Sequence, residues 1–395
     1  MKYDIIIIGA GIVGLATGLK IREKSPHKKI LIIDKETYVA AHQTGHNSGV
    51  IHSGLYYKPG SLKATNCLKG YHMMVDFCNQ YEVPFDLCGK LVVATSKEEI
   101  PLLHGLFDRG EENGLEGLKM LSQEEILEHE PHVRGLEGFF VPQTGIVNYT
   151  VVAKKMQQLL SETETSFALG HRVISIKTTS TSVHVCSDKE AFEATRLINC
   201  AGLYADKIAE MSGVNPGVKI IPFRGEYYKL IPEKEHLVKN LIYPVPDPDF
   251  PFLGVHFTRM QRGGVEAGPN AVLAYKREGY KKSDISFSEF IETLGWPGFR
   301  KVAKKYWKTG LGEFYRSYSK AAFTRALQKL IPEIEAKDLT AGGAGVRAQA
   351  CDRNGGLIDD FLIHETKHTI NVLNAPSPAA TSSLSIGESV ASLVI

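Results

Sequence analysis

The sequence predicts an α/β fold in which a Rossmann-type dinucleotide-binding domain is interleaved with a second domain built on a mixed, largely antiparallel β-sheet. Two observations support this prediction. Strand–turn–helix–strand patterns occur at the start of the chain, near 197–211 and near 369–394, and the blocks between them favour antiparallel strands. At 395 residues the chain is also long for one domain. The predicted first domain covers residues 1–85, 149–215 and 340–395, and the second covers 86–148 and 216–339.

The opening segment has the pattern of a strand, a tight turn, a helix and a second strand. Residues 3–8 are a continuous apolar run, as expected of a strand buried on both faces of a parallel sheet. A helical pattern follows the glycines as far as Ile21, and Ser25-Pro26 ends it. Residues 29–33 then form a second β-branched strand, which leads into Asp34.

The rest of the chain divides by the same criteria. Residues 42–54 are a long polar loop of the kind that often carries function, and Ser61 has the features of an N-cap for a helix to about residue 80. Further strands are expected at 91–94, 139–141, 146–147, 173–176, 183–186, 197–200 and 369–373, and throughout the strand-rich block 219–275. Further helices are expected at 149–160, at 204–211, within 283–330 and from about 381 onward.

Composition is that of an ordinary soluble globular protein. The formal net charge is +2 and 43% of residues are hydrophobic, so we expect no nucleic-acid partner. Lys301, Lys304, Lys305 and Lys308 make a local basic cluster, which indicates a solvated helix face or, as an alternative, a contact with a membrane surface.

The six cysteines are scattered and form no CxxC pair, which argues against a metal site and against a disulfide framework. Reduced thiols and the lack of a visible signal peptide predict a cytoplasmic protein. No apolar run approaches the roughly 18 residues that span a bilayer, so any membrane contact would be peripheral.

Gly9-Ala10-Gly11-Ile12-Val13-Gly14 is a GxGxxG motif between a strand and a helix. Gly9 permits the tight turn, Gly11 lets a pyrophosphate approach the backbone, and Gly14 allows close packing of helix on strand. The helix N-terminus offers free N–H groups to the phosphates. Asp34 lies 20 residues after Gly14, the spacing of a carboxylate that binds ribose hydroxyls.

The dinucleotide is predicted to be FAD rather than NAD. The polar loop 42–54 follows the second strand directly, as in FAD proteins of the glutathione-reductase type. A second motif for a pyridine nucleotide is missing, because the glycines at 342–345 have the wrong context. Electrons would then come from a bound substrate.

Several segments closely resemble the L-2-hydroxyglutarate dehydrogenase/oxidase family of the D-amino-acid-oxidase-like FAD superfamily. The most specific are TGHNSGVIHSGLYY (44–57) and GGAGVRAQ (342–349); INCAGLYAD (198–206), FRGEYY (223–228) and NAPSPAATSSLSIGE (374–388) extend the match over the chain. The resemblance implies oxidation of L-2-hydroxyglutarate to 2-oxoglutarate, with C2 transferring a hydride to flavin N5. It also implies that electrons pass on to oxygen or to a membrane quinone.

The same resemblance suggests which residues contact the cofactor, which we expect to be held without a covalent bond, although a link at His46 is possible. The predicted contacts are Gly9, Gly11, Gly14, Asp34, Thr44, Asn47, Ser48, Gly49, Val173, Ala201, Gly202, Pro378, Ala379, Ala380 and Thr381. The last four would begin the final helix, whose positive dipole end would stabilise reduced flavin.

Catalysis requires a base for the hydroxyl proton and cations for the two carboxylates of this substrate. His256, in a strand expected to roof the flavin, is the preferred base, and His52 in the polar loop is the alternative. Arg347 is the first candidate for the carboxylate clamp, followed by Arg259 and Arg224. Tyr56, Tyr57 and Tyr228 are possible hydroxyl donors.

Two other readings stay open. The same fold could serve an amine oxidase of the glycine or sarcosine type or a glycerol-3-phosphate dehydrogenase. A flavin-binding interaction protein without turnover is the alternative from another class. The sequence leaves the oligomeric state and the electron acceptor undetermined.

Overall fold

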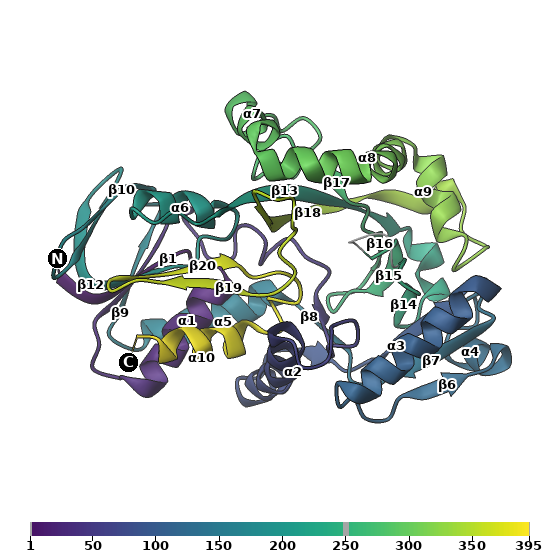
Figure 1. Ribbon diagram of the computed structural model, residues 1–395. Coiled ribbons are helices and arrows are strands. Elements are labelled where there is room, and N and C mark those ends of the chain that lie inside the picture. The colour runs from purple at the N-terminus through teal and green to yellow at the C-terminus, as the bar shows by residue number, and fades with distance from the viewer. Residues whose placement is uncertain (1, 248–252, 395) are drawn as a thin grey trace.

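The protein is described by a computed structural model over residues 2–247 and 253–394. In these residues eight strands form one sheet, nine form a second and three form a small third sheet (Figure 1). This arrangement confirms the predicted α/β fold, with a first sheet that is parallel at its centre and a second, largely antiparallel one.

The first sheet is centred on β1 (Lys2–Ile8), which lies parallel to both β2 (Ile30–Asp34) and β12 (Ala191–Asn199). Its apolar residues are buried because helices or strands cover both faces. The remaining strands are β9 (Thr165–Leu169), β10 (Val173–Thr178), β11 (Val183–Ser187), β19 (Leu362–Glu365) and β20 (Thr369–Asn374).

One face of this sheet is covered by four helices that share a hydrophobic core: α1 (Ile12–Lys24), α2 (Leu62–Gln80), α5 (Tyr149–Ser161) and α10 (Ser383–Ser392). Ser61 caps α2 as predicted, its side chain accepting a hydrogen bond from the Ala64 N–H at 3.1 Å. Helices α1 and α10 touch at Gly387, where a Cβ would lie 2.7 Å from the Ala16 carbonyl carbon. The C-terminal helix is therefore packed tightly onto the glycine-motif helix.

The second sheet carries helices on its two faces. Leu103 and Leu106 of α3 (Ile100–Glu112) join the core on one face, and Ile126 of α4 (Gln123–His129) and Phe323 of α9 (Lys320–Leu327) join the core on the other. Its strands are β5 (Lys90–Ala94), β6 (Lys119–Leu121), β7 (Glu137–Val141), β13 (Val218–Leu230), β14 (Leu241–Pro244), β15 (His256–Arg259), β16 (Val265–Gly268), β17 (Val272–Leu273) and β18 (Leu339–Asp352). The small third sheet contains β3 (Val50–Ile51), β4 (Phe85–Asp86) and β8 (Gly145–Val147).

Strand β18 corrects one predicted boundary. It pairs with β13 along nearly its whole length, so residues 340–352 lie in the second sheet and not with the dinucleotide-binding part (Figure 1). The sequence pattern did not predict this strand because it is rich in glycine. The glycines allow close packing, since a Cβ on Gly342 would lie 2.5 Å from the Tyr227 carbonyl oxygen. The other boundaries stay predictions, and residues 1, 248–252 and 395 of the predicted ranges lie outside the described residues.

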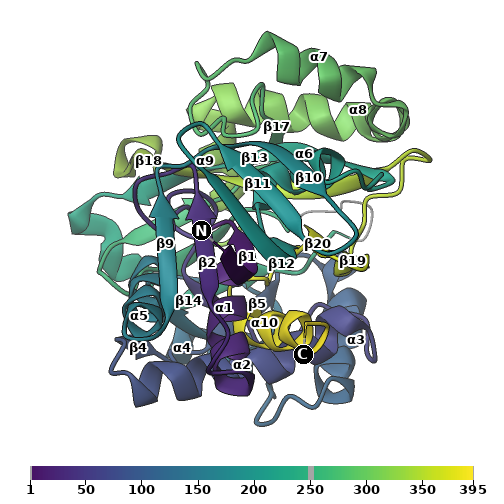
Figure 2. The same cartoon turned by 90° about the vertical axis from the view of Figure 1, so that its left-hand side faces the viewer.

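Helices α6 (Ala205–Met211), α7 (Phe287–Gly295) and α8 (Pro297–Tyr318) complete the fold. Helices α7 and α8 form an outer layer above β13 and β17, at the top of both views (Figures 1 and 2). No helix in the described part of the chain has both the length and the apolar character that crossing a membrane requires.

Candidate active site

A cavity of about 1000 Å³ opens where the first sheet meets the second. Its walls include residues that follow the carboxyl ends of β1, β2 and β12, together with residues from β13, β14, β15 and β18. Ligands of open α/β sheets bind outside the carboxyl ends of the strands. This cavity is therefore the candidate site for both a dinucleotide and a substrate.

The glycine motif forms a backbone cradle at this cavity. Gly9 has a φ of +112°, and a Cβ there would lie 2.4 Å from the Cys200 carbonyl oxygen, so the turn requires glycine. Gly11 lies in the cavity wall, where the missing side chain leaves the backbone accessible. Gly14 lies outside the wall and serves packing, since its Cβ would lie 2.0 Å from the Gly9 carbonyl oxygen.

Asp34 is held rigidly in the cavity wall at the end of β2. Its Oδ2 accepts a hydrogen bond from the Ala10 N–H at 2.7 Å, and its Oδ1 accepts one from the Glu36 N–H at 2.9 Å. Thr44 Oγ1 similarly accepts a hydrogen bond from the Ile12 N–H at 3.0 Å. The first turn of α1 and the carboxylate are thus fixed relative to each other, as dinucleotide binding requires.

The polar loop is folded by one side chain. The Asn47 amide donates to the Gln43 and Thr44 carbonyl oxygens at 3.0 and 2.7 Å, and its Oδ1 accepts the Gly49 N–H at 2.9 Å. Gly49 lies outside the cavity wall, and its φ is +67°. Glycine is therefore required here for the backbone conformation of the loop and not for contact with a ligand. Besides Gly9, Gly11 and Asp34, the predicted cofactor residues that line the wall are Thr44, Asn47, Ser48, Val173, Ala201, Gly202, Pro378, Ala379, Ala380 and Thr381.

The final helix begins later than predicted. Helix α10 starts at Ser383, so Pro378 to Thr381 form the turn that precedes it. Thr381 Oγ1 is 2.8 Å from the Tyr149 hydroxyl and accepts the His52 N–H at 3.1 Å. This turn therefore ties α5 and the polar loop together at the cavity.

The residues present fit FAD. The backbone cradle at Gly9 and Gly11, the anchored carboxylate of Asp34 and the extended wall match the needs of a dinucleotide. That the cofactor is held without a covalent bond stays a prediction. His46 lines the cavity, where its Nδ1 is 3.2 Å from the Ala344 carbonyl oxygen.

His256 is a buried, neutral histidine in the cavity wall. Its Nδ1–H donates to the Gly254 carbonyl oxygen at 2.8 Å, which leaves the Nε2 lone pair available as a proton acceptor. Burial, helped by the charges of Arg347 and Lys90, lowers the pKa of His256 to about 4. The side chain has the protonation state and tautomer of a general base.

His52 also lines the cavity. Burial and the charge of Lys90 lower the pKa of His52 to about 3, so this imidazole is neutral as well. The hydrogen bond that fixes its position is made by its backbone, whose N–H donates to Thr381 Oγ1. The structure thus brings both predicted histidines to one cavity but gives only His256 a tautomer-fixing partner among the described residues.

The predicted clamp residues separate into two groups. Arg347 on β18 and Tyr57 line the cavity, and burial lowers the pKa of Arg347. Arg224, Arg259 and Tyr228 do not line it.

Each of these three has another partner, which corrects the prediction. Arg224 is 1% exposed and pairs with Glu226 at 3.0 Å, and Arg259 pairs with Asp86 of β4 at 2.5 Å. The Tyr228 ring packs on Phe323, with 4.8 Å between ring centroids. We therefore do not assign these residues to the substrate.

Three further residues at this end of the cavity were not predicted from the sequence. Tyr227 and Tyr243 line the wall, and the Tyr243 ring lies 3.9 Å from the His256 ring. Lys90 is buried against two tyrosine rings, with its Nζ 4.5 Å from the Tyr56 ring centroid and 5.2 Å from that of Tyr243. A lone lysine in the apolar run KLVVA (90–94) was the signal that could have revealed it.

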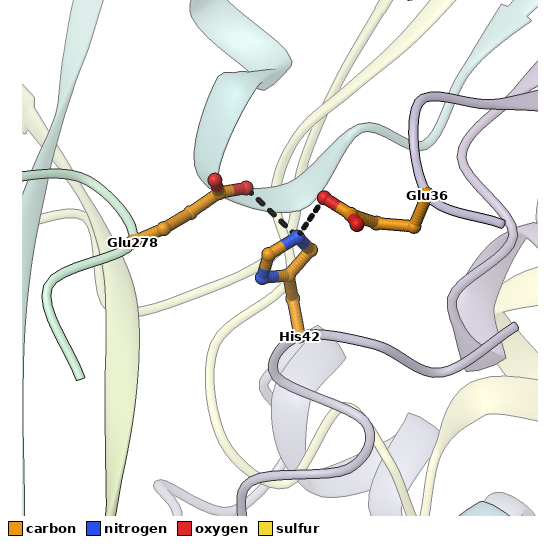
Figure 3. A group of neighbouring side chains, drawn as sticks. All are labelled: Glu36, His42 and Glu278. Atoms are coloured by element: carbon orange, nitrogen blue, oxygen red, sulfur yellow. Dashed lines mark hydrogen bonds and ion pairs between the residues drawn. The ribbon is translucent and has the colours of Figure 1, made fainter. Parts of the chain in front are cut away.

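Glu36, His42 and Glu278 form a cluster at the cavity (Figure 3). His42 Nε2 lies 3.0 Å from each carboxylate, and Lys35 Nζ lies 2.6 Å from Glu278 and 2.9 Å from His42 Nε2. The geometry would suit a metal ion, but the lysine ammonium already supplies the cation among these ligand atoms. The cluster therefore acts as an ion-pair junction between the loop after β2 and the loop that follows β17.

Comparison with known proteins gives the family. The model of the family described as FAD dependent oxidoreductase matches residues 4–393. The chain is 61% identical to the L-2-hydroxyglutarate dehydrogenase of Indibacter alkaliphilus, over 99% of this chain and 98% of that protein. It is 46% identical to the protein of the same name from Escherichia coli K12, over 99% of this chain and 93% of that protein.

Solved structures share the fold. L-α-glycerophosphate oxidase from Mycoplasma pneumoniae, with FAD bound, superposes with a TM-score of 0.80 at 21% identity, over 100% of this chain and 95% of that chain. Glycine oxidase from Geobacillus kaustophilus gives a TM-score of 0.75 at 16% identity, over 100% and 94%. The chain therefore belongs to the family of FAD dependent oxidoreductases, in the group of relatives named L-2-hydroxyglutarate dehydrogenase.

Proposed function

We propose that the protein oxidises L-2-hydroxyglutarate to 2-oxoglutarate with FAD as cofactor. The observation that carries the proposal is one cavity that joins a dinucleotide cradle to a neutral buried histidine and an arginine. The full-length similarity to relatives named L-2-hydroxyglutarate dehydrogenase supports the substrate. An amine oxidase or a glycerol-3-phosphate dehydrogenase would share the fold, but the relatives at 46–61% identity carry neither of those names.

We assign proton removal to His256. When bound, FAD supplies the acceptor for the hydrogen and two electrons that leave C2 of the substrate. His256 Nε2 then takes the proton of the hydroxyl group, because the Nδ1–H bond to Gly254 keeps Nε2 unprotonated. His52 stays the alternative base. The rates of cofactor reduction after substitution of each histidine distinguish the two assignments.

Arg347 is proposed to bind the carboxylate next to the reacting carbon. A guanidinium presents two parallel N–H groups to a carboxylate, which fixes the orientation of C2 as well as binding it. The Arg347 side chain lines the same cavity as His256 and lies close enough to influence its pKa. Tyr57, also in the wall, is proposed as an additional hydroxyl donor.

The products of turnover with different substrates test this proposal. We expect purified protein with bound FAD to convert L-2-hydroxyglutarate to 2-oxoglutarate in the presence of an artificial electron acceptor. Glycine, sarcosine and glycerol 3-phosphate serve as the comparison substrates. Turnover of one of these, with none of the hydroxy acid, would replace the proposal by the corresponding alternative. A protein that retains FAD but turns over none of them would favour the reading of a flavin-binding interaction protein.

Reduced cofactor is proposed to pass its electrons to oxygen or to a membrane quinone, with the protein in peripheral contact with the membrane. The outer face of α7 and α8 supports this contact. It exposes a set of large apolar side chains, with Phe287 77% and Trp307 56% exposed. The others are Ile285, Ile291, Leu294, Leu311, Tyr315 and Tyr318.

Charge is segregated on these helices in the way that an anionic lipid surface favours. The lysines at 301, 304, 305 and 308 are exposed and have no carboxylate partner among the described residues. The acidic residues of α7 and α8 instead face the rest of the protein. Glu289 accepts a hydrogen bond from the Tyr204 hydroxyl, Glu292 pairs with Lys219, and Glu313 is buried. Apolar and basic groups together are typical of helices that lie in a membrane interface.

Vesicle binding tests the contact. We expect the protein to sediment with vesicles that contain phosphatidylglycerol and to stay in solution with neutral phosphatidylcholine vesicles. The double variant Phe287→Ser/Leu311→Ser should lose this binding and retain turnover with a soluble electron acceptor. Unchanged sedimentation of the variant would remove α7 and α8 from the contact.

A further inference from the structure

Lys90 is a buried cation without a counter-charge. It is the first residue of β5, it is 1% exposed, and its ammonium group has no carboxylate or hydrogen-bond acceptor among the described residues. Its contacts are with aromatic rings, those of Tyr56 and Tyr243. An ammonium group buried in this way is costly unless an anion joins it.

The neighbouring titratable groups do not supply that anion. Cys67 on α2 influences Lys90 electrostatically, but burial raises the pKa of its thiol to about 12. His52 and His256 also feel the charge of Lys90, and both are neutral, with pKa values lowered by burial to about 3 and 4. The hydroxyl groups of Tyr56 and Tyr243 stay protonated because burial raises their pKa values. Each of these five groups is uncharged at neutral pH.

Lys90 contacts two aromatic rings at the end of the cavity that holds His256. Tyr56 and Tyr243 both line the cavity, and the Tyr243 ring contacts both Lys90 and His256, with its centroid 5.2 Å from the ammonium and 3.9 Å from the imidazole ring. The Tyr56 hydroxyl is buried and has no hydrogen-bond partner among the described residues. An unsatisfied ammonium and an unsatisfied hydroxyl therefore occur together in one wall.

We propose that Lys90, with Tyr56 and Tyr243, forms the subsite for the second carboxylate of the substrate and so selects dicarboxylic over monocarboxylic 2-hydroxy acids. The inference rests on the proposed function and deepens it. Arg347 is the cation for the carboxylate beside the reacting carbon, and Arg224 and Arg259 pair with carboxylates outside the cavity. Lys90 is the buried cation near His256 that still lacks an anion among the described residues.

In this subsite Lys90 is the charge that determines specificity, and Tyr56 and Tyr243 are the cavity-lining residues that it contacts. An ammonium attracts a carboxylate more strongly in a protein interior than in water, because the effective dielectric constant of the interior is lower. Burial lowers the pKa of Lys90 to about 7 in the absence of a ligand. An arriving carboxylate favours the charged form, so binding of a diacid should take up a proton near neutral pH.

The test compares two acids that the enzyme cannot oxidise at C2: glutarate, with two carboxylates, and pentanoate, with one. Binding is followed by the change in the visible absorption of FAD in the oxidised holoenzyme. In Lys90→Met, we expect the Kd of glutarate to rise about 30- to 100-fold, while that of pentanoate changes less than about threefold. Arg347→Met is the matched control, and it should weaken both acids because both carry the carboxylate that Arg347 binds.

Two further measurements distinguish a binding role of Lys90 from a purely structural one. Glutarate affinity in the wild type should fall as pH rises above about 7, and Lys90→Met should abolish this dependence. Removal of an unpaired buried charge should also leave the melting temperature unchanged or raise it. Tyr56→Phe is a second, milder variant, and it should weaken glutarate by about fivefold without affecting pentanoate.

Equal weakening of both acids in Lys90→Met, or no weakening of either, would overturn the subsite. A glutarate affinity independent of pH between 6 and 9 would also count against it. Because binding is measured without turnover, failure of the subsite can be distinguished from failure of the proposed function. A wild type that binds glutarate in this manner but is not reduced by L-2-hydroxyglutarate would refute the function and leave the diacid subsite in place.

Discussion

Arg277 and Asp206 form a buried, bidentate ion pair in which the two guanidinium NH groups lie 2.6 and 2.8 Å from the two carboxylate oxygens. Their side chains are 3% and 0% exposed. Arg277 also donates to the Leu203 carbonyl oxygen at 2.6 Å. The pair therefore joins α6, on the first sheet, to the loop that carries Glu278 and leads into α7.

Breaking this pair on one side should destabilise the protein strongly. Arg277→Met leaves the Asp206 carboxylate buried without its cation, which should lower the free energy of unfolding by about 3–5 kcal/mol. The double variant Arg277→Met/Asp206→Asn should recover much of this loss, because it buries no unpaired charge. Urea unfolding curves measure both. Equal stability of the single variant and the wild type would show that the pair does not hold these segments together.

The pH dependence of cofactor reduction tests His256. Because its pKa is lowered to about 4, the base is already unprotonated at neutral pH, and on the acid side kcat/KM should fall as pH drops through about 4. His256→Ala should slow reduction by roughly 10²–10⁴-fold with FAD still bound. Stopped-flow absorbance gives the rates. A larger loss in His52→Ala than in His256→Ala would transfer the role of base to His52.

The sequence was informative where function depends on local backbone geometry. The turn at Gly9, the carboxylate of Asp34 and the cap at Ser61 are set by neighbours in the chain, and the structure places them as the pattern predicts. The strand β18 was hidden because glycine has a low strand propensity. At Gly345 the reason for glycine is distant: a Cβ would lie 2.5 Å from the His46 carbonyl oxygen.

Long-range partners could not be read from the sequence. Arg259 seemed available for a substrate, but folding brings it to Asp86, 173 residues away in the chain. Lys90 directly precedes the strand predicted at 91–94, and the structure buries it against tyrosines from two other segments. Charge pairing depends on which strands become neighbours, and single-sequence patterns do not specify that order.

The ion-pair junction of His42 should make stability depend on pH. Burial and the charge of Lys35 oppose charging of His42, but the hydrogen bonds to Glu278 and Glu36 and the charge of Glu278 outweigh them and raise the His42 pKa above 6.5. The pKa of Glu278 is lowered to about 2 by His42 and Lys35, against burial, so this carboxylate stays ionised over the range tested. The contribution of charged His42 is therefore complete below about pH 6.5 and is lost as pH rises through its raised pKa.

Melting temperatures of the wild type and His42→Gln, measured from pH 5 to 9, give the comparison. The wild type should be the more stable protein at pH 5–6, and the difference should shrink at alkaline pH. A difference that does not vary with pH would mean that His42 is not charged in this junction.

The anchored carboxylate of Asp34 should control cofactor retention. Asp34→Ala should raise the Kd of FAD by about 10- to 100-fold, because hydrogen bonds to a charged acceptor are lost. Asp4→Ala is a matched control, since Asp4 also accepts a backbone N–H, from Lys29 at 2.7 Å, but does not line the cavity. Fluorescence of released flavin measures occupancy. Full FAD occupancy in Asp34→Ala would show that the ribose is held by other groups.

The central claim is that this cavity brings one enantiomer of a dicarboxylic hydroxy acid to FAD, with His256 as base and Arg347 as clamp. The most direct measurement is the visible spectrum of the FAD-loaded protein, followed without oxygen, after addition of L- or D-2-hydroxyglutarate. We predict that the L-enantiomer bleaches the flavin band and that the D-enantiomer leaves it unchanged. A flavin band that neither enantiomer bleaches, or that both bleach equally fast, would contradict the assignment.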